Sequence, residues 1–82
     1  MNRLLITVYV PSINKSYDVY ITLESQIGDL KNILGQAIEE LSNDRFISND
    51  NILVDSITGI EYDSNLLVSE TNIENGTKII LI

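Results

Sequence analysis

Two adjacent glutamates, Glu39 and Glu40, come nearest in this chain to a catalytic pair. Paired carboxylates perform general acid–base chemistry when their side chains face one another across a substrate. The surrounding residues predict a helix, and neighbouring helical positions point about 100° apart. The two carboxylates therefore diverge, and a solvated helix face is the favoured interpretation.

The residues at 49–51, together with Asp44 and Asp55, are of the types that bind Ca²⁺. A calcium loop places oxygen ligands at alternate positions and closes with a bidentate glutamate. The stretch SNDRFISNDNIL has an apolar residue where a ligand is required and lacks the closing glutamate. We expect an ordinary polar loop here and no metal site.

Catalytic side chains of other kinds are scarce. The chain has no histidine and no cysteine, which excludes imidazole catalysis, thiolate chemistry, disulfides and zinc fingers. Its hydroxyls lack a neighbouring base, and its isolated glycines match no phosphate-binding loop. We therefore expect no catalytic residues, no cofactor and no enzymatic activity. The lack of disulfides favours a reducing, intracellular compartment.

The net charge of −7 restricts the class of partner. The five basic residues are scattered singly along the chain: Arg3, Lys15, Lys31, Arg45 and Lys78. Phosphate backbones require clustered positive charge, and an anionic lipid surface repels an acidic protein. The apolar run 4–10 is too short to cross a bilayer and precedes Pro11, so it predicts a buried strand. We expect neither nucleic-acid binding nor membrane insertion.

Hydrophobic periodicity predicts the elements of the first half. Apolar residues alternate along 4–10 and along 17–23, with a turn at 11–16, which is typical of an antiparallel hairpin. The period then changes to three and four residues over 25–41, which predicts an amphipathic helix. The residues expected on its buried stripe are Ile27, Leu30, Ile33, Leu34, Ala37, Ile38 and Leu41.

The second half predicts three further strands. Segments 52–56 and 59–62 flank a turn, and 77–82 forms a terminal strand after a sharp turn at 74–76. The run Ile52-Leu53-Val54 is apolar in both registers, so the choice of buried face in strand 52–56 stays open.

The predicted order is therefore β-β-α-β-β-β in one domain, residues 1–82. A hairpin followed by a helix and more strands gives an α+β fold of two layers, a mixed sheet with one helix packed on one face. The apolar run 79–82 fits best as a central strand that is paired on both edges.

This order resembles the β-grasp fold of ubiquitin, and residues 63–82 support the resemblance. That stretch begins with an acidic turn at Asp63 and an apolar anchor at Val68. A Ser-acid-x-Asn-Ile step follows, formed by Ser69, Glu70, Asn72 and Ile73. A polar turn at 74–76 then leads to a terminal strand with the core residues Ile79 and Leu81. The helix opening QIGDLKNIL has the same spacing of apolar residues. At Thr71 ubiquitin has a tyrosine, so one hydrogen bond of that fold is expected to be missing.

The resemblance to ubiquitin does not extend to conjugation. Conjugation and sulfur-carrier activity require a flexible tail that ends in Gly-Gly, and this sequence ends at Ile82 within the predicted last strand. We therefore expect a protein that docks onto a partner without being ligated to it.

The chain is most similar in pattern to the YukD/EsaB-like ubiquitin-like proteins of bacteria. These are free-standing domains of about this length, with an opening strand near the initiator Met and an NG-x-x-I-x-L ending, here MNRLLITVYV and NGTKIILI. The group is associated with type VII (WXG100, Esx-type) secretion systems of Gram-positive bacteria. The resemblance implies a cytoplasmic accessory protein that binds a component of the secretion machinery. That component is expected to recruit the protein to the inner face of the membrane.

The open face of the sheet is the expected binding surface. If Ile79 and Leu81 point to the helix, the residues between and after them point away. The outward positions expected to form one apolar patch are Leu5, Tyr9, Tyr20, Val54, Ile80 and Ile82. Monomers rarely expose large contiguous apolar patches unless they bind a partner.

An alternative function uses the same patch differently. A homo-oligomeric ubiquitin-like module, unrelated to secretion, would pair two copies of this face about a two-fold axis. The mass of the protein in solution distinguishes the two functions.

Overall fold

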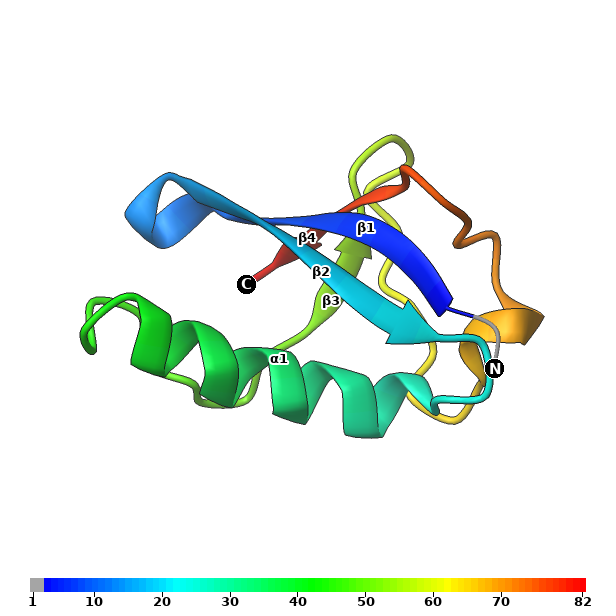
Figure 1. Cartoon of the computed structure of the whole chain (residues 1–82), viewed down its shortest axis with the longest axis horizontal. Coiled ribbons are helices and arrows are strands. Elements are labelled where there is room, and N and C mark those ends of the chain that lie inside the picture. The colour runs from blue at the N-terminus through cyan, green and yellow to red at the C-terminus, as the bar shows by residue number, and fades with distance from the viewer. Residues whose placement is uncertain (1–2) are drawn as a thin grey trace.

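The computed structural model describes residues 3–82, which form a mixed sheet with one long helix covering one face (Figure 1). The strands are β1 (Arg3–Val10), β2 (Lys15–Thr22), β3 (Leu53–Asp55) and β4 (Lys78–Leu81), and the helix α1 spans Ile27–Leu41. Two short 3₁₀ helices, η1 (Pro11–Ile13) and η2 (Val68–Glu70), lie in the connections. The predicted α+β class is confirmed. No helix within residues 3–82 is long and apolar enough to cross a membrane.

β1 and β2 form the predicted hairpin. Pro11 opens the 3₁₀ turn, and Asn14 closes it in a left-handed conformation with φ 51°, a geometry that asparagine tolerates. The Asn14 N–H donates to the Pro11 carbonyl at 3.1 Å. Because this turn pairs Val10 with Lys15, the alternating apolar residues of both strands point to the same side.

The last strand lies in the middle of the sheet, whose order is β2-β1-β4-β3. β4 runs parallel to β1 and antiparallel to β3. Ile79 and Leu81 are fully buried in the core, and Ile80 between them is half-buried on the other face. The prediction of a central terminal strand with two different faces is confirmed.

The start of α1 is fixed by the connection that follows β3. Gln26 at the N-cap makes no side-chain bond. Instead, the N–H groups of Ile27 and Gly28 donate to the carbonyls of Leu66 and Ser64 at 2.8 and 2.9 Å. Main-chain groups that a helix start leaves unpaired are thereby satisfied.

The buried face of α1 is narrower than predicted. Ile33 and Leu41 are 64% and 65% exposed, so their assignment to the core stripe is wrong. The core row is Ile27, Leu30, Leu34 and Ile38. Ile33 and Leu41 lie two helical turns apart on the adjoining row, which the sheet does not cover.

Residues 59–62 do not form the strand that was predicted between β3 and β4. In the described chain they make one bridge, between Val54 and Glu61. A tight turn precedes it, in which Gly59 has φ 75° and donates its N–H to the Asp55 carbonyl at 2.9 Å. Beyond this turn the segment follows β3 only briefly. The Asp55 N–H donates to the Ile60 carbonyl at 3.0 Å, and the Tyr62 N–H donates to the Leu53 carbonyl at 2.9 Å.

A hydrogen-bond network holds the long connection before β4. The Asn72 amide donates to the Asp55 carboxylate at 2.9 Å, and the Tyr62 hydroxyl donates to Asn72 Oδ1 at 3.1 Å. Thr71, where ubiquitin has a tyrosine, bonds locally to the Val68 carbonyl at 2.7 Å. Tyr62 thus supplies an aromatic hydroxyl to this connection from a different position.

The network shifts the pKa of two of its members. Hydrogen bonds from Asn72 and from the Ile57 N–H hold the pKa of Asp55 below its usual value. Burial, followed by the nearby Asp55 charge, raises the pKa of Tyr62 to about 12. Both shifts favour an ionised Asp55 beside a neutral Tyr62.

Candidate protein-interaction surface

The sheet face turned away from α1 carries three rows of side chains, which the strand registers set. From one end to the other these rows are Tyr20 with Leu5; Asp18, Thr7 and Lys78; and Ser16, Tyr9, Ile80 and Val54. Ile82 follows Ile80 on the same face and is joined to Ile52 by two main-chain hydrogen bonds of 3.1 Å. The face therefore has an apolar end at each side of a polar middle row.

Five of the six predicted surface residues reach solvent. Tyr20, Ile82 and Leu5 are exposed, while Tyr9 and Ile80 are half-buried. Val54 is only 8% exposed, so its assignment to the open patch is wrong.

Val54 is covered because the chain folds back beside β3. Its main chain pairs with Ile80 on one side and bridges to Glu61 on the other. Its neighbour Leu53 is the residue that enters the core, at 1% exposure. The register that the sequence left open is thereby settled in favour of Leu53.

The middle row divides the predicted single patch into two. The Thr7 hydroxyl donates to Asp18 at 2.9 Å across β1 and β2. Lys78 of β4 pairs with Thr7 on the opposite edge of β1. Its ammonium lies 5.2 Å from the centre of the Tyr9 ring, within cation–π range. What remains accessible beyond this row is a cluster of Tyr9, Ile80 and Ile82, which we call the Tyr9 cluster.

The opposite apolar end is smaller and is also capped by a cation. The Arg3 guanidinium carbon lies 4.8 Å from the centre of the Tyr20 ring, and Tyr20 pairs with Leu5 across the strands. A cation thus lies over the tyrosine ring at each end of the face, and the Tyr9 cluster differs in having two isoleucines beside its tyrosine.

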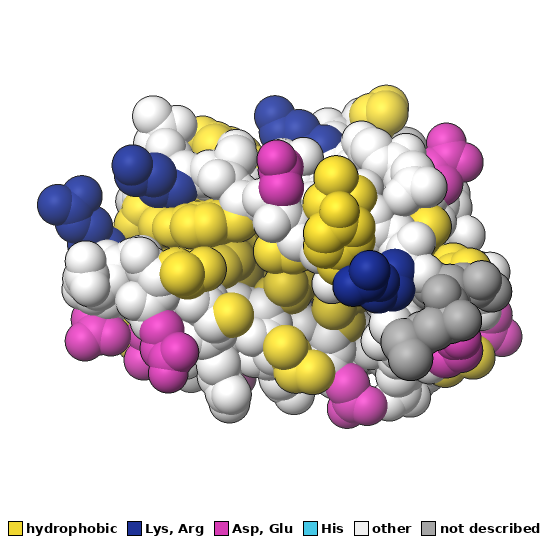
Figure 2. Space-filling model, in the orientation of Figure 1, with side chains coloured by type: hydrophobic (Ala, Val, Ile, Leu, Met, Phe, Trp, Pro, Cys, Tyr) yellow, Lys and Arg dark blue, Asp and Glu magenta, His cyan; other side chains and the backbone are white. Residues whose placement is uncertain are grey.

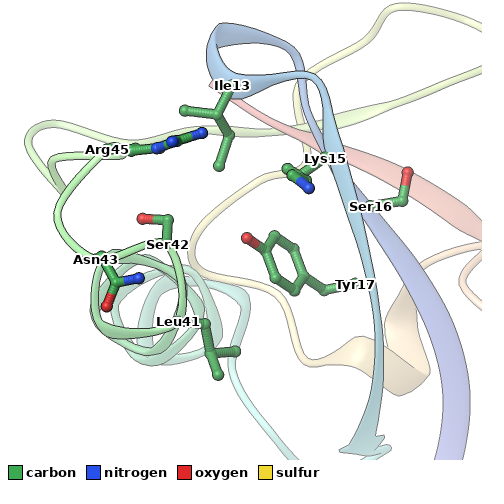
Figure 3. Close-up of a pocket in the computed structure, with 8 residues that line it drawn as sticks. All are labelled: Ile13, Lys15, Ser16, Tyr17, Leu41, Ser42, Asn43 and Arg45. Atoms are coloured by element: carbon green, nitrogen blue, oxygen red, sulfur yellow. The ribbon is translucent and has the colours of Figure 1, made fainter.

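The sequence analysis did not predict a hollow that lies between the tip of the hairpin and the end of α1. It has a volume of about 450 Å³ and is lined by Ile13, Lys15, Ser16, Tyr17, Leu41, Ser42, Asn43 and Arg45 (Figure 3). We call it the hairpin–helix hollow. Figure 2 shows apolar side chains between these two elements, with basic side chains beside them. The sequence feature that could have indicated this hollow is Leu41, an apolar residue in the last turn of α1.

The outer sheet face and the hairpin–helix hollow both combine aliphatic, aromatic and charged side chains. Within residues 3–82, no three acidic side chains are placed to hold a metal ion. Groups of this kind are suited to contact with another polypeptide.

Comparison with known proteins identifies the fold. No protein-family model and no curated protein matches the sequence. The structure is similar to a ubiquitin-like domain of Arabidopsis thaliana, with TM-score 0.73 and 22% identity over 100% of this chain and 78% of that one. The ubiquitin-like domain of Plasmodium falciparum Dsk2 gives TM-score 0.73 and 14% identity over 96% and 95%.

A chain of the ESX-5 inner membrane complex is also similar, with TM-score 0.83 and 8% identity over 100% of this chain and 21% of that one. At such identities the likeness concerns the fold alone. The mixed sheet, its strand order and the helix on one face, with these neighbours, are those of a ubiquitin-like β-grasp fold.

Proposed function

We propose that this protein is a non-catalytic ubiquitin-like adaptor that binds a component of a bacterial type VII secretion system in the cytoplasm. The observation that carries the proposal is the Tyr9 cluster. It places two isoleucines and a tyrosine together at one end of an open sheet face. Covering such a cluster removes apolar surface from water and favours association.

The secretion partner is supported by two independent likenesses. A chain of the ESX-5 inner membrane complex contains the same fold over the whole length of this chain. The ending NGTKIILI resembles that of the free-standing ubiquitin-like proteins associated with Esx-type secretion. A ubiquitin-like domain is thus a part that such an apparatus uses.

Calorimetric titration against the purified cytoplasmic regions of the type VII membrane components of the encoding bacterium tests the proposal. We expect Ile80→Asp to weaken binding by roughly tenfold or more, because it buries an unpaired carboxylate in the contact. Its circular dichroism should match that of the wild type, since Ile80 is only half-buried. Gln36→Asp, an equal charge change on the exposed side of α1, should bind normally.

Ile79→Asp is the matched variant for the other face of β4. Ile79 is fully buried, so a carboxylate there should unfold the chain. The proposal is rejected if the wild type binds none of the components, or if folded Ile80→Asp binds as well as the wild type. Equal unfolding of both variants contradicts the assignment of Ile80 to the outer face.

A further inference from the structure

We infer that Asn75 is a modification site, which converts spontaneously to aspartate and isoaspartate, and that strand β1 controls the rate of this conversion. The side-chain amide is the reactant, water is the co-reactant, and ammonia is the leaving product. The inference does not depend on the function proposed above, because it uses no residue of the Tyr9 cluster.

The reaction begins when the main-chain nitrogen of the residue after an asparagine loses its proton. This nitrogen attacks the asparagine Cγ, a new C–N bond closes a five-membered imide, and the side-chain nitrogen leaves as ammonia. Water then opens the imide at either of its carbonyl carbons. One opening gives aspartate, and the other gives isoaspartate, in which the main chain runs through the former side chain.

Asn75 is the asparagine of this chain that best suits ring closure. It is followed by Gly76, whereas each of the other eight asparagines precedes a residue that has a side chain. Glycine has no Cβ to obstruct the attack, and it adopts unusual backbone angles readily. Asn75 and Gly76 are both exposed and line a hollow of about 420 Å³, so water can reach the imide.

In the folded chain Leu5 of β1 holds both reacting groups. The Leu5 N–H donates to Asn75 Oδ1 at 2.9 Å, and the Gly76 N–H donates to the Leu5 carbonyl at 2.8 Å. The first bond fixes the side-chain amide in place. The second bond acts on the nitrogen that must attack, because hydrogen bonding to the protonated form of a group disfavours loss of its proton.

The turn around Asn75 adds to this restraint. The Thr77 N–H donates to the Glu74 carbonyl at 3.0 Å, and the Thr77 hydroxyl accepts the Glu74 N–H at 2.9 Å. The Thr77 carbonyl in turn accepts the Thr7 N–H of β1 at 3.0 Å. Ring closure therefore requires this turn to separate from the start of β1, and such local openings are a minor population of a folded chain.

The two products differ in what they do to the fold. Isoaspartate adds one methylene to the main chain before Gly76, so Gly76 is displaced from the Leu5 carbonyl and the turn cannot re-form as before. Aspartate leaves the main chain unchanged and keeps an oxygen acceptor for the Leu5 N–H. Isoaspartate thus marks those molecules in which β1 has separated from the turn.

Mass spectrometry of the full chain, incubated at mildly alkaline pH, tests the control by β1. Methylation by a protein L-isoaspartyl methyltransferase identifies the isoaspartate. In guanidinium chloride, which unfolds the chain, Asn75 should convert before any other asparagine. In the native state we expect its conversion to be slower by roughly tenfold or more, because it waits for local opening.

Two matched variants separate local opening at β1 from general loss of stability. Thr77→Val removes the hydroxyl that accepts the Glu74 N–H, and should speed native conversion by roughly threefold or more. Thr58→Val removes a hydroxyl that accepts the Ile60 N–H at 3.2 Å in a turn that β1 does not hold, and should leave the native rate unchanged. Each native rate is divided by the rate of the same variant in guanidinium chloride, which corrects for any effect of Thr77 on the chemistry itself.

The isoaspartate form, separated by ion exchange through its added negative charge, tests the consequence for the fold. It should melt below Asn75→Asp, which carries the same charge without the added methylene and should melt close to the wild type. The inference is overturned if another asparagine converts first in guanidinium chloride, or if native and unfolded rates are equal. It is equally overturned if Thr77→Val speeds conversion no more than Thr58→Val does, or if the isoaspartate form melts with Asn75→Asp.

Discussion

At the scale of residues, Asp55 links the short strand β3 to the irregular chain around it. One carboxylate oxygen accepts the N–H of Ile57 at 2.8 Å, and the other accepts the Asn72 amide at 2.9 Å. Asp55 therefore closes the turn after β3 and ties it to the connection before β4. A carboxylate that accepts hydrogen bonds from both sides is stabilised in its ionised form.

Asp55→Asn should lower the melting temperature at neutral pH, because the amide cannot accept all of these hydrogen bonds. The folded-state pKa of Asp55 lies below its unfolded value, which is about 3.9. Its contribution to stability is thus present above that value and is lost as the pH falls through the folded pKa. Thermal melts between neutral and acidic pH should show the gap between wild type and variant closing below about pH 4.

The control for this titration is Asp50→Asn. Asp50 is exposed and accepts no side-chain hydrogen bond within residues 3–82, and asparagine suits its φ of 49°. The control should melt close to the wild type at every pH. A gap for Asp55→Asn that stays constant or widens in acid would show that the carboxylate charge does not stabilise the fold.

At the scale of elements, Gly35 shows that a residue unfavourable for a helix is required for packing. A Cβ at this position would collide with Ser48 Oγ and would lie 2.9 Å from Asn51 Oδ1. Ser48 and Asn51 are bonded to each other at 2.6 Å, and Asn51 reaches the Ile82 carbonyl at 3.4 Å. The glycine thus lets the loop after α1 lie against the helix and reach the end of the chain.

Gly35→Ala should destabilise the protein by about 1–3 kcal/mol, the usual cost of overpacking, although alanine favours helix formation. Asn32→Ala on the exposed side of the same helix raises helix propensity without a collision, and should be neutral or slightly stabilising. Urea denaturation measures both. A stabilising Gly35→Ala would mean that the loop is free to move away from the helix.

The elements that could be predicted from the sequence are those in which the spacing of apolar residues fits one kind of secondary structure. Alternating apolar residues predicted β1 and β2, and apolar residues spaced three and four apart predicted α1. Periodicity could not separate Leu34 from Ile33, because the width of the buried face depends on where the sheet ends. The segment 59–62 has apolar residues suited to a strand, but the turn at Gly59 leaves it one bridge.

At the scale of the whole molecule, the candidate surfaces were predictable to different degrees. The outer face followed from alternation once β4 was placed centrally, and the sequence placed Ile80 and Ile82 on it correctly. The polar row through Thr7 depends on the register of three strands, and the burial of Val54 depends on the turn beside it. The hairpin–helix hollow joins segments about thirty residues apart, which no local pattern brings together.

The same surface properties predict that the protein is a monomer of 9.2 kDa. A two-fold dimer through the outer face would need a self-complementary patch of about 800 Å² on each copy. The polar row interrupts the apolar area, and two copies in contact would bring net charges of −7 within a Debye length, about 8–10 Å at moderate salt. Light scattering at micromolar concentrations should give the monomer mass at low and at high salt. A stable mass of twice that value for the wild type, together with the monomer mass for Ile80→Asp, would contradict the adaptor function. It would support the homo-oligomeric module, since a second copy would then occupy the Tyr9 cluster.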